Sequence, residues 1–450
     1  MNLLNLVEGI NNILWSYLLI FLLCGAGIFL TIKLGFVQIK KFKLMFKQTF
    51  SRKTKKKDSG ITSFQALATA VAAQVGTGNL AGAATAIVAG GPGAIFWMWI
   101  SAFFGMGTIF SEAVLAQKFR VEKKNGEILG GPAYYIERGF GSRKLGVFFA
   151  LALICSSWLT GNMVQTNSVA ISISKSYHIS GFAIGIIISL LTGLVIVGGV
   201  KRIASVTEKI VPIMALFFII GSLVIVISNY QNIIPAFKMI FKGAFNPRAA
   251  TGGVIGVTIK EAMRYGISRG LFSNEAGMGS TPHAHAVANV DHPVQQGLVA
   301  MLGVFIDTFI VLTCTALVIL TTGALDGKIT GIELTQKAFV NGFGGFGSTF
   351  ISISLFFFAF STIIGWYFFG ELNVKFIFGD KGVNFYKILF LIFLVIGSVI
   401  DVPLVWQLAD TFNGIMVIPN IIAILGLYKL VKRELRDYNE NFLEDDKKVS

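Results

Sequence analysis

Residues 74–82 read Gln-Val-Gly-Thr-Gly-Asn-Leu-Ala-Gly and lie in the middle of an apolar stretch that runs from residue 61 to residue 90. A second apolar stretch, 252–290, is interrupted in the same way by Phe-Ser-Asn-Glu at 272–275. Backbone N–H and C=O groups need partners inside a membrane, so a helix unwinds there only beside protein, water or a ligand. The two interruptions therefore predict broken helices near 76–79 and near 272–275, on either side of a binding site.

The composition is that of a membrane protein. Of 450 residues, 54% are hydrophobic and only 14% are charged, with a mean hydropathy of +0.72, whereas soluble domains carry about 25% charged residues. Apolar stretches recur close to the roughly 20 residues that a spanning helix needs. They predict an all-α membrane protein of about 11 transmembrane helices, at 12–32, 61–90, 93–117, 146–174, 180–200, 210–228, 252–290, 297–322, 348–370, 386–400 and 402–430.

The basic residues indicate the orientation. The formal net charge is +15, and 29 of the 38 Lys and Arg residues lie in alternate connections and the C-terminal tail, at 33–57, 118–144, 201–209, 375–387 and 429–448. This asymmetry is typical of cytoplasmic segments, and it favours a surface near anionic lipid over a nucleic-acid partner. The first apolar stretch follows Glu8 and no Lys or Arg, so we expect a retained helix rather than a signal peptide. The sequence thus predicts a multi-pass protein of the cell membrane, with its N-terminus outside and its C-terminus cytoplasmic.

The two interrupted stretches also predict an internal repeat. The tetrapeptide Asn-Leu-Ala-Gly at 79–82 recurs as Asn-Glu-Ala-Gly at 274–277, and the expected topology gives the two stretches opposite directions. Interrupted helices in corresponding positions are typical of inverted-repeat transporters. We therefore divide the chain into an extra N-terminal helix with a basic segment, a first repeat of five helices, an extracellular connection, a second repeat of five helices and a cytoplasmic tail: 1–60, 61–228, 229–251, 252–430 and 431–450.

The chemistry of such a break follows from its free backbone groups. N–H groups at the start of a half-helix, together with the helix dipole, suit a carboxylate, and free carbonyls at the end of the preceding half suit a cation. Gly76 and Gly78 permit torsions that other residues resist. The alternative is that these glycines serve close helix packing.

At these residues the chain resembles the alanine or glycine:cation symporter family. The resemblance rests on 74–82 and on Gly-Leu-Phe-Ser-Asn-Glu-Ala-Gly-Met-Gly-Ser at 270–280, and it covers about 61–430. It implies a transporter fold of the LeuT type, with ten core helices in two inverted repeats, and it implies sodium-driven uptake of alanine, glycine or similar amino acids.

The resemblance also implies roles for individual residues. The substrate carboxylate would meet the N–H groups of Thr77 and Gly78, and Asn79 would serve one sodium ion. A second sodium site would use carbonyls of the first broken helix and two adjacent hydroxyls: Ala72, Val75, Ser361 and Thr362. The LeuT pattern places a Tyr on the substrate carboxylate, but this chain has none between 145 and 174.

Several polar and aromatic residues complete the predicted site. Asn162, Gln165 and Thr166 are spaced to share one helix face, where the first two would take the place of the missing Tyr or make interhelical hydrogen bonds. The second break adds Phe272, Ser273 and Asn274 as substrate-binding candidates. Trp366 and Phe272 would cap a small pocket, or would serve only packing.

Two acids in apolar stretches leave coupling to protons as an alternative to coupling to sodium. Glu275 lies near mid-membrane, where acids are functional candidates, although Asn274 would alternatively cap the second half-helix with Glu275 in its first turn. Asp307 would suit proton coupling. Arg269 with Asp410 is a candidate outer gate. His283, His285 and His292 lack the spacing of a metal site, and we interpret Cys24, Cys155 and Cys314 as buried small residues.

These observations favour a secondary transporter that imports small amino acids with Na⁺ by alternating access. A proton-coupled carrier that uses Glu275 or Asp307 is the alternative. A channel would need a continuous polar pore, and an intramembrane enzyme would need a nucleophile with a base or a metal. Neither pattern is present, so we expect no enzyme activity.

Overall fold

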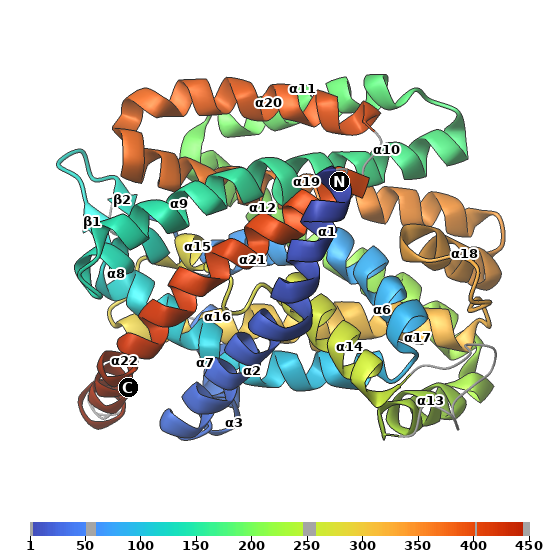
Figure 1. The fold of residues 1–450 in the computed structure, drawn as a ribbon, viewed down its shortest axis with the longest axis horizontal. Helices are drawn as coiled ribbons and strands as arrows, with labels where there is room; N and C mark the ends of the chain where they lie inside the picture. The colour runs from blue at the N-terminus through green and yellow to red at the C-terminus, as the bar shows by residue number, and fades with distance from the viewer. Residues whose placement is uncertain (1–2, 51–59, 246–257, 401–402, 444–450) are drawn as a thin grey trace.

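The chain folds into a bundle of helices with one short hairpin. The computed structural model describes residues 3–50, 60–245, 258–400 and 403–443 (Figure 1). Its N-terminal part is a run of helices: α1 (Leu3–Ile13), the π-helical η1 (Leu14–Leu18), α2 (Leu19–Lys33), α3 (Val37–Lys40) and α4 (Phe42–Phe50). The helix expected at 12–32 therefore begins earlier, at Leu3, and Glu8 lies inside it. Part of the basic segment, 51–59, lies outside the described residues.

The first predicted repeat contains the elements between residues 63 and 228. They are α5 (Ser63–Gln74), η2 (Gly78–Gly82), α6 (Ala83–Gly90), α7 (Ala94–Lys118), β1 (Val121–Glu122), β2 (Ile128–Leu129), α8 (Pro132–Arg138), α9 (Arg143–Trp158), η3 (Leu159–Met163), α10 (Val164–Tyr177), α11 (Gly181–Ile196) and α12 (Gly199–Ser228). The antiparallel strands β1 and β2 form a hairpin, which departs from an all-α chain.

The connection that follows is helical as well, because it holds η4 (Tyr230–Asn232) and α13 (Ile233–Phe245). The second predicted repeat holds α14 (Ile259–Asn274), α15 (Pro282–Ala286), α16 (Pro293–Val304), η6 (Phe305–Leu312), α17 (Thr313–Thr321), α18 (Gly331–Phe343), α19 (Phe346–Phe378), η7 (Gly379–Gly382), α20 (Val383–Val399) and α21 (Pro403–Gly426). The tail holds α22 (Tyr428–Asp437) and η8 (Tyr438–Phe442). The polar connection after residue 322 thus contains α18, a helix outside the predicted set.

The lengths of the helices fit a membrane protein. Within the described residues, six helical segments are long and apolar enough to cross a membrane, or up to seven if the bent pair Ser63–Gln74 and Gly78–Gly90 forms one span. Exposed large apolar side chains line the outward faces of α11, α12 and α20, as expected for helices that face lipid.

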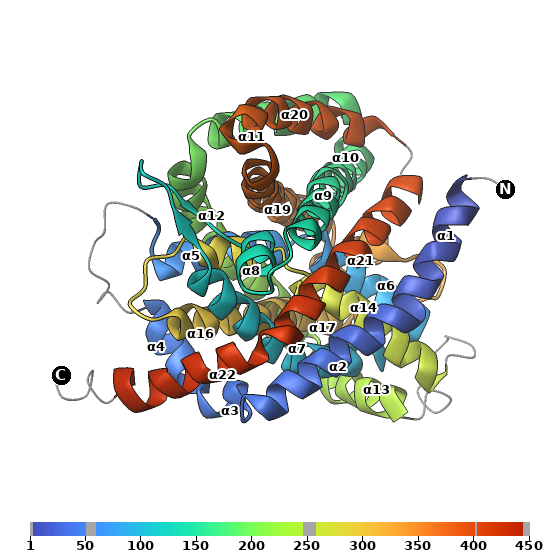
Figure 2. The ribbon, with the colours of Figure 1, turned by 60° about the vertical axis from the view of Figure 1, so that its left-hand side comes forward.

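Helices from the two halves of the chain pack on each other. Helix α7 lies against α14 and α16, and α11 lies against α20 along one side of the molecule (Figures 1 and 2). The β1–β2 hairpin, α8 and α22 lie toward one end of the bundle, whereas α13 and α18 lie toward the other (Figure 1). We refer to these as the hairpin end and the α18 end.

Both interrupted helices begin at a capping box. Thr62 accepts from the Gln65 N–H and its own N–H bonds the Gln65 side chain, and Thr258 pairs with Glu261 in the same way. Such reciprocal bonds satisfy N–H groups that a helix start leaves free. Pro293 is the first residue of α16, where its missing N–H costs no helical hydrogen bond, whereas Pro92 lies two residues before α7.

The first break lies where the sequence places it. Helix α5 ends at Gln74, η2 begins at Gly78, and the two arms are bent by 51°. The second break lies later than predicted, because Phe272, Ser273 and Asn274 are still helical and α15 begins only at Pro282.

Asn274 therefore ends a helix rather than starting one, which corrects the capping alternative. Glu275 is the C-terminal cap of α14 in the left-handed region, with φ 57°. Gly277 and Gly279 follow with φ of 87° and 84°, torsions that a side chain resists.

Candidate functional site

The first break is held by its own side chains. The Asn79 Oδ1 accepts the Gly76 N–H at 3.1 Å, and the Thr77 N–H reaches the Gln165 Oε1 of α10 at 3.4 Å. Thr77 and Asn79 are fully buried, and the Thr77 hydroxyl has no hydrogen-bond partner in the structure. Unwound backbone thus lies beside a polar group of another helix, as a site inside a membrane requires.

Space, and not torsion, explains the two glycines of this break. Neither Gly76 nor Gly78 has a positive φ, which corrects the sequence-based reason for them. A Cβ on Gly76 would lie 2.6 Å from the Thr362 Oγ1, and one on Gly78 would lie 3.3 Å from the Ser273 Cα. The glycines therefore let α5 and η2 approach α19 and α14 closely.

Oxygen atoms from the first break and from α19 meet at Ala72. The Thr362 Oγ1 donates to the Ala72 carbonyl at 2.9 Å, and the Ser361 Oγ reaches the same carbonyl at 3.4 Å. The Ser361 hydroxyl also donates to the Phe358 carbonyl of its own helix at 3.0 Å, so the Thr362 hydroxyl makes the stronger contact with the first break. Val75 is the C-terminal cap of α5, three residues after Ala72. Neutral oxygens are the ligands that a hard cation prefers, and the absent Cβ of Gly76 leaves room beside Thr362.

Asp307 joins the two broken helices. It is fully buried in η6, and its Oδ1 accepts from the Asn79 Nδ2 at 2.7 Å and from the Ser273 Oγ at 3.1 Å. The neighbouring Thr308 bonds the other carboxylate oxygen and accepts from the Asn274 Nδ2 at 3.2 Å. One carboxylate therefore contacts one residue of the first break and one at the end of α14.

Trp366 of α19 contacts the second break at Glu275, whereas Asp307 contacts the end of α14 before it. Its indole N–H donates to Glu275 at 3.0 Å, and Ser280 donates to the second oxygen of the same carboxylate. A Cβ on Gly161 of η3 would lie 2.2 Å from the Trp366 Cβ. Trp366 is thus fixed between η3 and the second break.

Not every predicted residue lies at the breaks. Gln165 contacts Thr77, but Asn162 directs its amide to the Phe390 carbonyl of α20 at 2.7 Å. Thr166 bonds back to the Asn162 carbonyl at 3.0 Å. Asn162 thus makes the interhelical bond that the sequence left as an alternative, while its Oδ1 is buried without a partner.

A cavity of 340 Å³ leads to Gly78 from the α18 end. Phe272 and Trp406 line it with ring centroids 6.5 Å apart, and so do Arg269 and Asp410, whose charged groups lie 3.8 Å apart. The pair proposed from the sequence as a gate is therefore brought together at the mouth of the site.

The support of the second break was not predicted from the sequence. Glu112 of α7 is fully buried and accepts from the Gly277 N–H at 3.0 Å and from Asn420 at 2.6 Å. Asn420 in turn accepts from Tyr135 and donates to the Gly277 carbonyl at 2.9 Å. The one acid within the apolar stretch 93–117 was a signal for this role.

The π-helical segments η2, η3 and η6 were missed as well, although each contains or adjoins a residue of the site. Segments of this kind often mark functional sites. Nothing in the residue types of these stretches separates them from an α-helix.

The histidines and cysteines have ordinary surroundings. His283 bonds the Ser280 carbonyl and Asn373 and stacks between Phe149 and Phe369. In the part of the chain that the structure describes, no group of three His, Cys, Asp or Glu side chains could hold a metal ion. Of the cysteines, Cys314 is buried, but Cys24 and Cys155 are half-buried, because their helix faces are only partly covered.

The long apolar helices of the described residues define a multi-pass membrane protein. A solved structure of a manganese transporter variant from Eremococcus coleocola superposes with a TM-score of 0.53 at 15% identity, over 82% of this chain and 78% of that one. The sequence pattern of the sodium:alanine symporter family matches residues 1–450. The chain belongs to this family, which confirms the resemblance seen in the sequence.

Relatives within the family carry several names. The sodium/alanine symporter AgcS of Methanococcus maripaludis is 45% identical over 98% of both chains. The probable sodium/glutamine symporter GlnT of Bacillus subtilis is 41% identical over 95% of this chain and 89% of its own. The putative sodium/proton-dependent alanine carrier YrbD of the same organism is 42% identical over 96% of this chain and 92% of its own.

Proposed function

We propose that this protein imports small amino acids, alanine and glycine among them, together with Na⁺ by alternating access. One observation carries the proposal. The unwound backbone at 75–77 lies between the α19 hydroxyls that meet at Ala72 and the Ser273 side chain beside Gly78. This arrangement offers neutral oxygens to a cation next to backbone groups that suit a carboxylate.

The proposal includes a membrane arrangement. The N-terminus and the α18 end face outward, the hairpin end faces the cytoplasm, and the chain crosses the membrane 11 times. The breaks in α5–η2 and α14–α15, and the packing of α7 on α16 and of α11 on α20, support two inverted repeats of five helices at 61–228 and 252–430.

The substrate would lie beside the first break, with its carboxylate on the N–H groups of Thr77 and Gly78. Without substrate, the Gln165 Oε1 accepts a long hydrogen bond of 3.4 Å from the Thr77 N–H. When the substrate carboxylate accepts from this N–H instead, the Gln165 side chain would turn to the substrate ammonium group. Phe272 lines the cavity at Gly78, and we expect Trp366 to limit the space for a substrate side chain from the other side. This favours alanine and glycine, and a glutamine-sized cargo would need one of these aromatic rings to move.

Sodium would be the second cargo, bound by the Ala72 and Val75 carbonyls with Ser361 and Thr362. Asn79 would contribute to a further ion beside the substrate. One net charge entering down a membrane potential of 100 mV supplies about 2.3 kcal/mol, which supports roughly 50-fold accumulation at about 1.36 kcal/mol per factor of ten.

Uptake of labelled alanine into proteoliposomes tests the proposal. We expect uptake with an inward sodium gradient, loss of uptake when potassium replaces sodium, and continued uptake when an ionophore collapses the pH gradient. Uptake that is indifferent to sodium would refute sodium coupling.

Proton coupling is the second candidate, because Asp307 and Glu275 are buried carboxylates that accept hydrogen bonds from residues at the two breaks: Asn79 and Ser273 for Asp307, and Ser280 for Glu275. It requires uptake to follow a proton gradient without sodium. In that case Asp307→Asn or Glu275→Gln, which keep one acceptor oxygen, would leave exchange of bound alanine intact but abolish proton-driven accumulation.

A further inference from the structure

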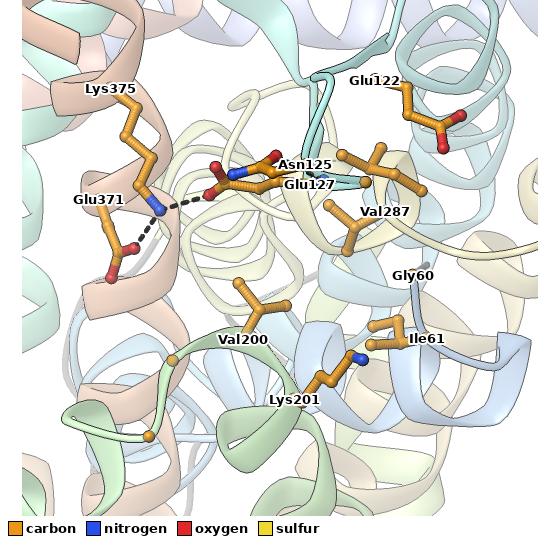
Figure 3. A pocket seen from close by; sticks show the side chains of 14 residues that line it. Gly60, Ile61, Glu122, Asn125, Glu127, Val200, Lys201, Val287, Glu371 and Lys375 are labelled. Atoms are coloured by element: carbon orange, nitrogen blue, oxygen red, sulfur yellow. Dashed lines mark hydrogen bonds and ion pairs between the residues drawn. The ribbon is translucent and has the colours of Figure 1, made fainter. Parts of the chain in front are cut away.

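The largest of the cavities described lies at the hairpin end and is separate from the mouth at Gly78. It has a volume of 590 Å³ and lies between the start of α5, the residue after α15, the turn before α12, the hairpin and α19 (Figure 3). Its charged lining residues include Lys201, Glu122, Glu127, Glu371 and Lys375.

One wall of this cavity joins the two broken helices. Ile61 forms a parallel β-bridge with Ala288: the Ile61 N–H donates to the Val287 carbonyl at 3.2 Å, and the Asn289 N–H donates to the Ile61 carbonyl at 2.8 Å. The end of α7 holds the same segment, because Gln117 donates to Ala288 at 2.9 Å and Arg120 does so at 2.6 Å. The start of α5, the end of α15 and the end of α7 are therefore one hydrogen-bonded unit.

An ion network crosses from the hairpin to α19 on the opposite wall. Lys375 lies 2.6 Å from Glu371 on its own helix and 2.6 Å from Glu127 of the hairpin, as Figure 3 shows. Lys123, also in the hairpin, lies 2.9 Å from Glu127 and 2.8 Å from Asp380 in η7. The Lys375 side chain is only 10% exposed, whereas that of Asp380 is 70% exposed, so the network runs from the cavity wall to the surface.

The hairpin connects parts that must separate if the bundle rocks. It follows α7 after two residues, and α7 packs on α14, which ends at the second break, and on α16, which continues into η6 with Asp307. Helix α19 packs on α9, α10 and α12, and it also contacts α5 of the broken-helix unit. A rotation of the broken-helix unit away from α19 would therefore pull the hairpin from Lys375 and Asp380.

We propose that the β1–β2 hairpin is a latch on the cytoplasmic cavity, and that the contacts Glu127–Lys375 and Lys123–Asp380 hold the inward path closed. The inference rests on the proposed function for the direction of transport and for the side of the membrane. Substrate release would require both hairpin contacts to break, after which Lys375 keeps Glu371 as its partner. The buried lysine is thus never left without a counter-charge during opening, which limits the cost of the step.

The test removes the latch without changing net charge. The double variant Lys123→Gln, Glu127→Gln deletes the two hairpin charges that contact Lys375 and Asp380, leaves Lys375 paired with Glu371 and leaves Asp380 in solvent. The reporter is a cysteine at Val287, whose side chain lines the cavity and is only 2% exposed, in a background where Cys24, Cys155 and Cys314 are replaced by Ala. A charged thiol reagent is applied to purified protein in lipid nanodiscs, and the rate of modification is measured.

We expect the double variant to raise the modification rate roughly two- to tenfold, the range for two partly exposed ion pairs. The matched control is Lys337→Gln, Asp326→Asn, which removes a 2.8 Å ion pair near α18 and should leave the rate unchanged. An unchanged rate in the hairpin variant, or an equal increase in the control, overturns the latch. If the double variant does not elute as a single species, Glu127→Gln alone and the parent protein in high choline chloride replace it, with a smaller increase expected from each.

Failure of the latch and failure of the proposed function are distinguishable. The modification rate is measured without substrate, so it reports opening even if alanine uptake is absent. Sodium-driven uptake with no change in the modification rate would leave the transport proposal intact and remove only the latch.

Discussion

Removal of the Thr362 hydroxyl is the most direct test of the sodium site. Thr362→Val keeps the branched shape of the side chain and deletes the oxygen that lies 2.9 Å from the Ala72 carbonyl. A bond between a polar group and an ion contributes about 1.5–3 kcal/mol. At about 1.4 kcal/mol per factor of ten, the half-saturating sodium concentration for alanine uptake should rise about tenfold to a hundredfold.

The neighbouring hydroxyl should matter less. Ser361 reaches Ala72 only at 3.4 Å and also bonds back to Phe358, so Ser361→Ala should raise the half-saturating sodium concentration severalfold at most. Ser354→Ala is the matched control, because Ser354 lies on the same helix and its hydroxyl bonds the carbonyl one turn back at 2.8 Å. The assay is initial alanine uptake into proteoliposomes across a series of sodium concentrations.

Two results would show that the Thr362 hydroxyl is not a sodium ligand. If Thr362→Val keeps the sodium dependence of the parent protein at equal reconstitution, the hydroxyl pair is not a sodium site. A loss of maximal uptake without a change in the half-saturating concentration would also count against it, because a ligand of the ion must change the affinity for the ion.

Four further outcomes are expected. Gly76→Ala should abolish alanine binding because its Cβ would lie 2.6 Å from the Thr362 Oγ1, whereas Gly82→Ala, which meets nothing within 4 Å, should bind normally in isothermal titration; normal binding by Gly76→Ala would contradict the close approach. Gly78→Val should elute as a single species in gel filtration but fail to bind alanine, and parental affinity would remove the first break from the site. Alanine and glycine should compete for uptake while tryptophan does not, so strong inhibition by tryptophan at equal concentration would disprove the small pocket. The hydrogen bond from Lys123 lowers the pKa of Asp380, and Lys375 and Lys123 lower the pKa of Glu127 against the effect of burial, which raises it. A carboxyl whose pKa is depressed in the folded protein contributes stability at pH values above its pKa in the unfolded chain. The difference in melting temperature between the parent and the Lys123→Gln, Glu127→Gln variant should therefore be constant between about pH 5 and about pH 8 and should shrink below about pH 4.

The position of the first break could be predicted because its residue types conflict with a membrane helix. Two glycines and an Asn within an apolar stretch make few apolar side-chain contacts and leave polar backbone groups uncovered, and the helix is interrupted there in the structure. The second break was placed too early for a physical reason. Ser273 and Asn274 are polar, but η6 supplies their partners Asp307 and Thr308, so the helix continues through them and unwinds only at Glu275.

The roles of individual residues depend on which helices are in contact, and a single sequence contains little information about contacts between distant helices. The prediction for Thr362 rested on a family resemblance, and the structure places its hydroxyl at Ala72. The amide of Asn162 instead meets a carbonyl of α20, a helix more than 200 residues away in the chain. The support of the second break by Glu112 and Asn420 likewise joins distant residues that no local pattern relates.

The π-helical segments mark places where the length of this chain can change. Hydrogen bonds in η2, η3 and η6 run from residue i to residue i+5, so a turn of each holds an extra residue relative to the α-helix around it. Deletion of one residue from η6 would restore α-helical bonding and leave α17 close to its present orientation relative to α16. Deletion of one residue from a regular turn of α16 would instead rotate α17 by about 100°, which would turn Thr315, Ala316 and Ile319 out of the buried interior. Single-residue insertions and deletions among relatives should therefore occur at the π-helical segments or in the surface connections, and not in the regular helices between them.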